Sequence, residues 1–212
     1  MSRLDRLLLV SALLLLVSAG MRWLRVPVVD PFLGAERILV NSASADPSSL
    51  RAGLRPRLVI FSDYACSYCR QLDSLLESHP QVTRRFEVSW RHAPIIGEQL
   101  SRTAAKMVIC EGMVLGTAGA HSALFRTRRT ISDAIDSLRS AFLASDISSC
   151  MDSEEAAEVL ARDLDAASAL GIHATPAIMV DSMLFRGLPA DIISRLVNIA
   201  DARPKPRHST TQ

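Results

Sequence analysis

A short apolar run that leads into two closely spaced cysteines places the strongest constraint on the fold of this chain. Residues 57–61 are Arg-Leu-Val-Ile-Phe, a β-branched and aromatic run that is typical of a buried strand. Cys66 and Cys69 follow, and leucines at helical spacing continue to residue 76. Pro80 then ends the helical pattern, because proline breaks the hydrogen bonding of a helix interior. The sequence therefore predicts a strand-to-helix junction that carries a Cys-Ser-Tyr-Cys motif.

The first cysteine of this motif is well placed to act as a nucleophile. The first turn of a helix offers unpaired backbone N–H groups and the positive end of the helix dipole, which stabilise a thiolate at Cys66. Cys69 lies one turn further in, so we expect it to be the resolving thiol of a redox-active disulfide. Tyr64 and Tyr68 flank Cys66. They predict either an aromatic rim around the reactive sulfur or ordinary packing at the end of the strand.

Zinc binding and a purely structural disulfide are the alternatives for this cysteine pair. Zinc sites use the same spacing, but the two remaining cysteines, Cys110 and Cys150, stand singly and far along the chain. A disulfide within the motif would close so short a loop that it would add little stability. The sequence therefore favours redox chemistry and implies no metal or organic cofactor.

The rest of the chain predicts further strands and a block of helices. An alternating segment at residues 86–90 predicts a second strand, and helical patterns fill residues 98–170. Asp152 or Ser153 is placed to cap the last of these helices, and Gly171 to end it. The elements expected there are helices at 104–114, 118–125 and 131–143, strands at 177–180 and 183–185, and a closing helix at 190–200. This order predicts an α/β fold.

The N-terminal residues 1–25 predict a signal peptide or a membrane anchor. Arg3 and Arg6 precede apolar residues 7–21, the order found in secretory signals. That stretch is shorter than the roughly 20 residues of a transmembrane helix, and Arg22 follows at once, so cleavage and retention are both left open. Either outcome predicts an extracytoplasmic protein of the bacterial periplasm, tethered to the inner membrane by this segment or released from it.

The charge pattern gives no sign of nucleic-acid binding. The 24 Lys and Arg residues nearly balance the 22 Asp and Glu residues, and the positive excess belongs to the N-terminal segment. The body has no basic run interleaved with aromatic residues. We expect a tether at 26–56 with a short strand at 37–40, one globular domain at 57–201, and a disordered tail at 202–212.

Two motifs together resemble the DsbA-like branch of the thioredoxin fold. Residues 61–69 look like that family's strand, acidic residue and CxxC motif, and residues 171–177 look like its glycine and Thr–cis-Pro turn. The resemblance covers about residues 58–200. It implies a thioredoxin-like fold in which residues 98–170 form a helical insertion between the β-α-β and β-β-α halves.

The resemblance also implies roles for single residues. In this family the cis-proline turn faces the CxxC motif and binds the substrate backbone, so Thr175 and Pro176 are expected to contact substrate. Tyr68, within the CxxC motif, is a further residue that we expect to bind substrate. Asp63 could relay protons to Cys69, and capping of the adjacent turn is the alternative.

The two remaining cysteines are expected to form a second pair. Some exported relatives carry a structural disulfide in the helical insertion, which favours a bond between Cys110 and Cys150. Two separate buried thiols are the alternative. Among the histidines, we expect His92 and His173 near the active face, and His79, His121 and His208 at the surface or in loops.

These features predict an exported protein thiol:disulfide oxidoreductase. Its partners would be protein substrates with thiols or disulfides, a membrane redox partner that recharges the CxxC pair, and the membrane itself through the N-terminal segment. Ser67 replaces the usual proline and the motif lacks a histidine, which favours a moderate reduction potential. The direction of electron flow stays open. A redox-inert thioredoxin-fold module that binds unfolded chains, in the manner of a chaperone, is the alternative function.

Overall fold

The computed structural model describes residues 36–37, 55–116, 118–127, 130–142 and 146–202. They belong to a compact unit that spans Gly34–Gln212. The predicted signal or anchor and the C-terminal tail from residue 203 lie outside the described residues, as does the predicted tether except for residues 36–37 and 55–56. Within the described part of the chain, no helix is long and apolar enough to cross a membrane.

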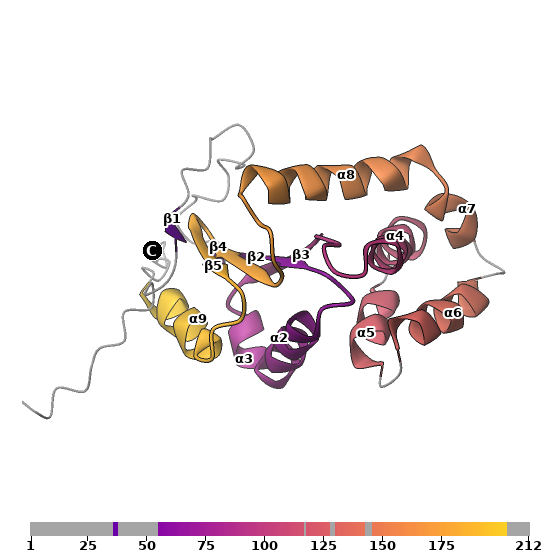
Figure 1. The fold of residues 1–212 in the computed structure, drawn as a ribbon. Coiled ribbons are helices and arrows are strands. Elements are labelled where there is room, and N and C mark those ends of the chain that lie inside the picture. The colour runs from indigo at the N-terminus through magenta and orange to yellow at the C-terminus, as the bar shows by residue number, and fades with distance from the viewer. Residues whose placement is uncertain (1–35, 38–54, 117, 128–129, 143–145, 203–212) are drawn as a thin grey trace, which may run out of the picture. The chain divides into compact units, whose positions relative to one another are not determined.

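A five-stranded sheet lies at the centre of the fold (Figure 1). Its strand order is β1-β5-β4-β2-β3, with β2 parallel to β3 and the other neighbours antiparallel. The strands are β1 (Glu36–Arg37), β2 (Arg57–Ser62), β3 (Glu87–His92), β4 (Ala177–Val180) and β5 (Met183–Arg186). The edge strand β1 lies inside the segment predicted as a tether, and it begins one residue before the strand expected at 37–40.

Eight helices are described around this sheet. They are α2 (Ser67–Ser78), α3 (Pro80–Thr83), α4 (Glu98–Leu115), α5 (Gly119–Arg126), α6 (Ile131–Phe142), α7 (Ile147–Met151), α8 (Glu154–Ala169) and α9 (Ile192–Asp201). The sequence does not predict the short helices α3 and α7. Figure 1 shows α2, α3 and α9 on one side of the sheet and α8 on the other. This is the mixed α/β thioredoxin-like fold that the sequence predicts.

Alternating side chains of β2 supply both faces of the core. Leu58 and Ile60 point to the side of α2, α3 and α9, whereas Val59 and Phe61 point to the side of α8. This alternation follows from the two-residue period of a strand, and it explains why β2 is apolar on both sides. Strand β2 is therefore packed on both faces, which fixes the position of the motif that follows it.

Local signals in the sequence set the ends of α8. Ser153 caps its N-terminus by accepting a hydrogen bond from the Ala156 N–H at 3.2 Å, as one of the two expected caps. Gly171 follows its C-terminus with a φ of 60°, a left-handed conformation that favours glycine. The chain then turns back toward the sheet and enters β4.

Candidate active site

The CxxC motif lies at the point where β2 passes into α2. Cys66 is the N-cap residue of α2, with its N–H donating to the Asp63 carbonyl at 3.0 Å. The Cys66 side chain is only 3% exposed, and Cys69 is fully buried. Both thiols are free. Cys66 thus lies at the helix N-terminus, as the sequence predicts. Its side chain is less exposed than that of an ordinary reactive thiol.

The Thr175–Pro176 turn lies directly against the first cysteine. The peptide bond between these residues is cis, and the Cys66 thiol donates a hydrogen bond to the Thr175 carbonyl at 3.3 Å. The register of the sheet brings them together, because Phe61 of β2 is paired with Ala177 of β4. Two segments that are 109 residues apart in sequence therefore form one site.

The Cys69 sulfur is held among hydrogen-bond donors in an apolar surrounding. Burial raises the pKa of the Cys69 thiol to about 12, while the hydrogen bond from the Asp63 backbone N–H and the nearby Ser62 and Thr175 side chains oppose that rise. The Asp63 N–H lies 3.5 Å from the sulfur. Cys69 is therefore a neutral thiol near pH 7.

The Asp63 carboxylate holds the loops on both sides of the motif. It accepts hydrogen bonds from the Ala65 N–H at 2.8 Å, the Ile95 N–H at 2.8 Å and the Ser101 hydroxyl at 2.6 Å. The Asp63 residue is 1% exposed, so these partners compensate the burial of its charge. This arrangement supports the capping role that the sequence offered as the alternative to a proton relay.

The two tyrosines that flank Cys66 occupy opposite environments. Tyr68 is 61% exposed and stands at the surface beside the motif. Tyr64 is 3% exposed and packs tightly against Phe125, with 4.8 Å between ring centroids. Tyr68 is therefore available at the rim of the site, whereas Tyr64 belongs to the packing beneath it.

His121 lies on α5 with its side chain largely buried, which corrects the expectation that it lies at the surface or in a loop. Its side chain is 12% exposed, its Nδ1 lies 3.0 Å from the Tyr64 hydroxyl, and its Nε2 lies 3.3 Å from the Asp73 carboxylate. Burial raises the pKa of Tyr64 well above its usual value, and the nearby charge of Asp73 raises it further. The phenol therefore stays protonated, and the imidazole lies between this hydroxyl and the Asp73 carboxylate. This chain of hydrogen bonds joins the CxxC loop, α2 and α5.

Sequence reasoning missed both Asp73 and His121. Asp73 lies four residues after Cys69 on α2, so helical spacing alone places it on the same face as the buried cysteine. That signal was available in the sequence. His121 lies 57 residues from Tyr64, and no local pattern predicts this contact.

The other two histidines of interest differ in burial. His92 is 9% exposed, and burial lowers its pKa to about 4, so its imidazole is neutral at pH 7. Its backbone N–H donates to the Asp163 carboxylate at 2.8 Å, and Arg91 donates to the same carboxylate. His173 is exposed near the cis-proline turn.

Cys110 and Cys150 are joined by a disulfide, which links α4 to α7. Their Cα atoms lie 5.7 Å apart, and the bond closes a 40-residue separation. This bond lies within the helical insertion, apart from the two free thiols.

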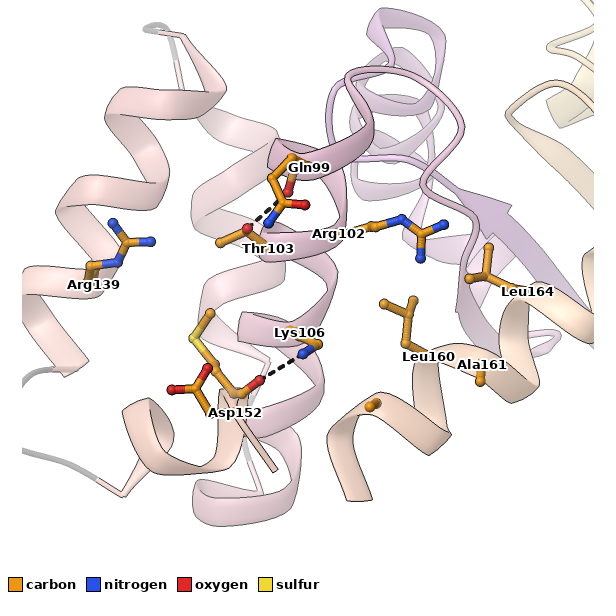
Figure 2. A pocket seen from close by; sticks show the side chains of 11 residues that line it. Gln99, Arg102, Thr103, Lys106, Arg139, Asp152, Leu160, Ala161 and Leu164 are labelled. Atoms are coloured by element: carbon orange, nitrogen blue, oxygen red, sulfur yellow. Dashed lines mark hydrogen bonds between the residues drawn. The ribbon is translucent and has the colours of Figure 1, made fainter. Parts of the chain in front are cut away.

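A cavity of about 440 Å³ lies elsewhere, between α4, α6 and α8 (Figure 2). In Figure 2, the guanidinium groups of Arg102 and Arg139 lie on opposite sides of α4, and Lys106 donates to the Met151 carbonyl at 2.9 Å. Neither free cysteine lines this cavity, so it is not the thiol site.

The fold and the paired free thiols beside a cis-proline define a thiol–disulfide oxidoreductase. The family model described as Thioredoxin matches residues 55–198. The chain therefore belongs to the thioredoxin family.

Solved structures share this fold at low sequence identity. A thioredoxin-like oxidoreductase from Silicibacter pomeroyi DSS-3 is 22% identical, with a TM-score of 0.61, and the match covers 75% of this chain and 95% of that one. A periplasmic thioredoxin-like protein from Salmonella enterica serovar Typhimurium is 26% identical, with a TM-score of 0.56 and coverages of 74% and 92%. The thiol-disulfide exchange protein alpha-DsbA2 from Wolbachia pipientis is 19% identical, with a TM-score of 0.58 and coverages of 74% and 87%. No curated protein sequence matches the chain.

Proposed function

We propose that this protein exchanges disulfides with protein substrates through Cys66 and Cys69, outside the cytoplasm. The observation that carries the proposal is the contact of the Cys66 thiol with the Thr175 carbonyl beside the cis-proline. This contact places a sulfur at a helix N-terminus against a turn whose backbone can pair with an extended chain.

The exchange proceeds by two substitutions at sulfur. The Cys66 thiolate attacks a substrate disulfide, so a mixed disulfide forms and the other substrate sulfur leaves as a thiolate. Cys69 then loses its proton and attacks the Cys66 sulfur, which releases the second substrate thiolate and leaves the Cys66–Cys69 disulfide. Two electrons pass to the substrate. The reverse sequence oxidises a substrate dithiol, and a redox partner at the membrane then restores the pair.

Substrate contacts in this proposal surround the first cysteine. The Thr175–Pro176 turn supplies the backbone surface, and the exposed ring of Tyr68 supplies an apolar one. The exposed side chains of Ile95 and Ile96 follow in the loop that the Asp63 carboxylate binds. A protein segment with apolar residues next to its cysteine fits this rim.

Export is the second part of the proposal. The arginines and apolar residues of the first 25 positions support it, as does the likeness to a periplasmic thioredoxin-like protein at 26% identity. Cell fractionation of the full chain, followed by an alkaline carbonate wash, distinguishes a tethered protein from a released one. Recovery of the whole protein from the cytoplasm would contradict export.

Single cysteine variants test the exchange reaction. We expect Cys66→Ser to abolish exchange with a disulfide-bonded peptide, and Cys69→Ser to accumulate mixed disulfides that migrate as larger species without reductant. The double variant Cys110→Ala/Cys150→Ala is the matched control, because it removes two sulfurs outside the site and should keep exchange. If Cys66→Ser exchanged disulfides at the wild-type rate, the reaction would not use this pair, and the binding module would become the better function.

A further inference from the structure

Two buried hydroxyls next to the second cysteine have no partner in the resting site. The Ser62 Oγ and the Thr175 Oγ1 are buried, and neither makes a hydrogen bond in the described structure. Burial of an unpaired hydroxyl costs free energy, so its presence in a folded protein calls for an explanation. Both residues lie beside the cysteine pair, since Ser62 precedes the Asp63 N–H that approaches the Cys69 sulfur, and the Thr175 carbonyl contacts the Cys66 thiol. Both side chains also oppose the rise in the pKa of the Cys69 thiol.

The position of Ser62 follows from the sheet. Ser62 is the last residue of β2 and is 4% exposed, and the next residue, Asp63, directs its backbone N–H at the Cys69 sulfur from 3.5 Å. Thr175 approaches from the turn before β4, which pairs with β2. One N–H group and two hydroxyls thus converge on this sulfur.

Apolar side chains make up most of the cluster that buries Cys69. The cluster that buries this cysteine includes Ala104, Met107, Leu124 and Phe125. An anion at this place would be poorly solvated, so nearby donors carry most of its stabilisation.

We propose that Ser62 is a catalytic residue, whose hydroxyl donates a hydrogen bond to the Cys69 sulfur whenever that sulfur carries negative charge. This inference rests on the proposed exchange reaction. Cys69 is an anion when it attacks the Cys66 sulfur, where the Cys66–Cys69 bond forms and the substrate thiolate leaves with the electron pair. It is an anion again in the reverse direction, when a substrate thiolate attacks Cys66 and Cys69 departs. Thr175 supplies a second donor to the same atom.

A donor that is idle in the resting states acts on the rate alone. The Ser62 hydroxyl is unpaired while Cys69 is a thiol, and a Cys66–Cys69 disulfide carries no charge for it to stabilise. Its stabilisation is therefore confined to the states in which Cys69 carries negative charge. These states are scarce near neutral pH, so the hydroxyl raises the rate and leaves the equilibrium between the thiol and disulfide states unchanged. Loss of the hydroxyl should slow resolution and leave the reduction potential near neutral pH unchanged.

The decisive variant is Ser62→Ala, which removes one oxygen from a buried position. We expect resolution of a preformed mixed disulfide to slow about tenfold, the loss typical of one hydrogen bond to a charged group, while the reduction potential stays at the wild-type value. Ser78→Ala, at the exposed end of α2, is the matched control and should change neither quantity. Thr175→Val tests the second donor in the same way.

A second measurement separates this role from a structural one. In the Cys66→Ser protein, Cys69 is the only free thiol, because Cys110 and Cys150 are bonded to each other. Adding Ser62→Ala should slow its alkylation by iodoacetamide at a given pH, since fewer molecules carry the thiolate. Loosened packing would instead speed alkylation by exposing the sulfur.

Two results would overturn the inference: wild-type resolution in Ser62→Ala, or faster alkylation in the double variant. The inference would also be overturned if Ser62→Ala changed the reduction potential by as much free energy as it changed the resolution rate, because the hydroxyl would then stabilise the resting thiol or disulfide state. If the wild-type protein itself did not exchange disulfides, the proposed function would fail instead, so the two failures are distinguishable.

Discussion

Cys69, the proposed resolving cysteine, lies in a site that stabilises its thiol and its thiolate to different extents. The buried site suits the neutral thiol, which explains a pKa near 12, yet the reaction requires the anion. We propose that hydrogen-bond donors next to the sulfur lower the free energy of forming the thiolate while the site stays closed to water.

The high pKa of Cys69 predicts a steep dependence of resolution on pH. Below that pKa, the thiolate fraction rises about tenfold per pH unit, so the resolution rate should rise with the same slope through neutral pH. Rapid-quench measurement of mixed-disulfide decay checks this. A plateau near pH 7 would show that another group takes the proton before the attack.

Buried His92 predicts a loss of stability in acid. Its pKa is lowered to about 4 in the folded protein from an ordinary value of 6.5, so the unfolded chain binds more protons between these two values. Stability is therefore complete above about pH 6.5 and falls as the pH drops toward 4, by up to about 3 kcal/mol.

Urea unfolding of His92→Gln at several pH values measures this contribution. The variant should lose most of the acid-dependent change in unfolding free energy over that range. His173→Gln, at an exposed position, is the control and should keep it. Equal acid sensitivity in His92→Gln and the wild-type protein would contradict the assignment.

At the level of elements, one carboxylate connects the CxxC loop to the segment before α4. Asp63 accepts hydrogen bonds from backbone groups on both sides, so Asp63→Asn should lower the unfolding free energy by about 3 kcal/mol, because an amide faces some of these donors with its own N–H groups. Denaturant unfolding measures this change. If Asp63 instead relays protons, the variant should retain stability and lose the pH slope of resolution.

A disulfide fastens the helical insertion in a similar way. The Cys110–Cys150 bond joins α4 to α7, and its removal in Cys110→Ala/Cys150→Ala should lower the unfolding free energy by about 2–4 kcal/mol. Exchange through the CxxC pair should persist below the melting temperature. Non-reducing peptide mapping of the wild-type protein checks the bond itself, and recovery of both cysteines as free thiols would refute it.

Across the whole molecule, the sheet brings together the two halves of the site. The antiparallel pairing of β2 with β4 places the end of one strand beside the start of the other. The CxxC motif follows the first strand, and the Thr175–Pro176 turn precedes the second. The insertion between them adds α5, whose His121 bonds to Tyr64 beneath the motif. Catalytic position is thus a property of the complete sheet rather than of any single segment.

The sequence by itself predicted most of the helices and strands of this protein and the type of reaction that we propose for it. Residues 57–61, the CxxC spacing and the Ser153 and Gly171 signals are local patterns, because strands, helix starts and helix ends depend on neighbouring residues. Asp73 could also have been found in this way from its spacing to Cys69.

Only the tertiary structure decided which side chains surround the reacting sulfurs. The burial of His121, its bond to Tyr64 and the approach of Ser62 and Thr175 to Cys69 depend on contacts between distant segments. Such contacts leave no local pattern in the sequence, because they form only when separate helices and strands pack against one another. The proposed type of reaction could therefore be predicted from residues 61–69, whereas the hydroxyls that we propose as donors to the Cys69 sulfur could be identified only from the paired strands.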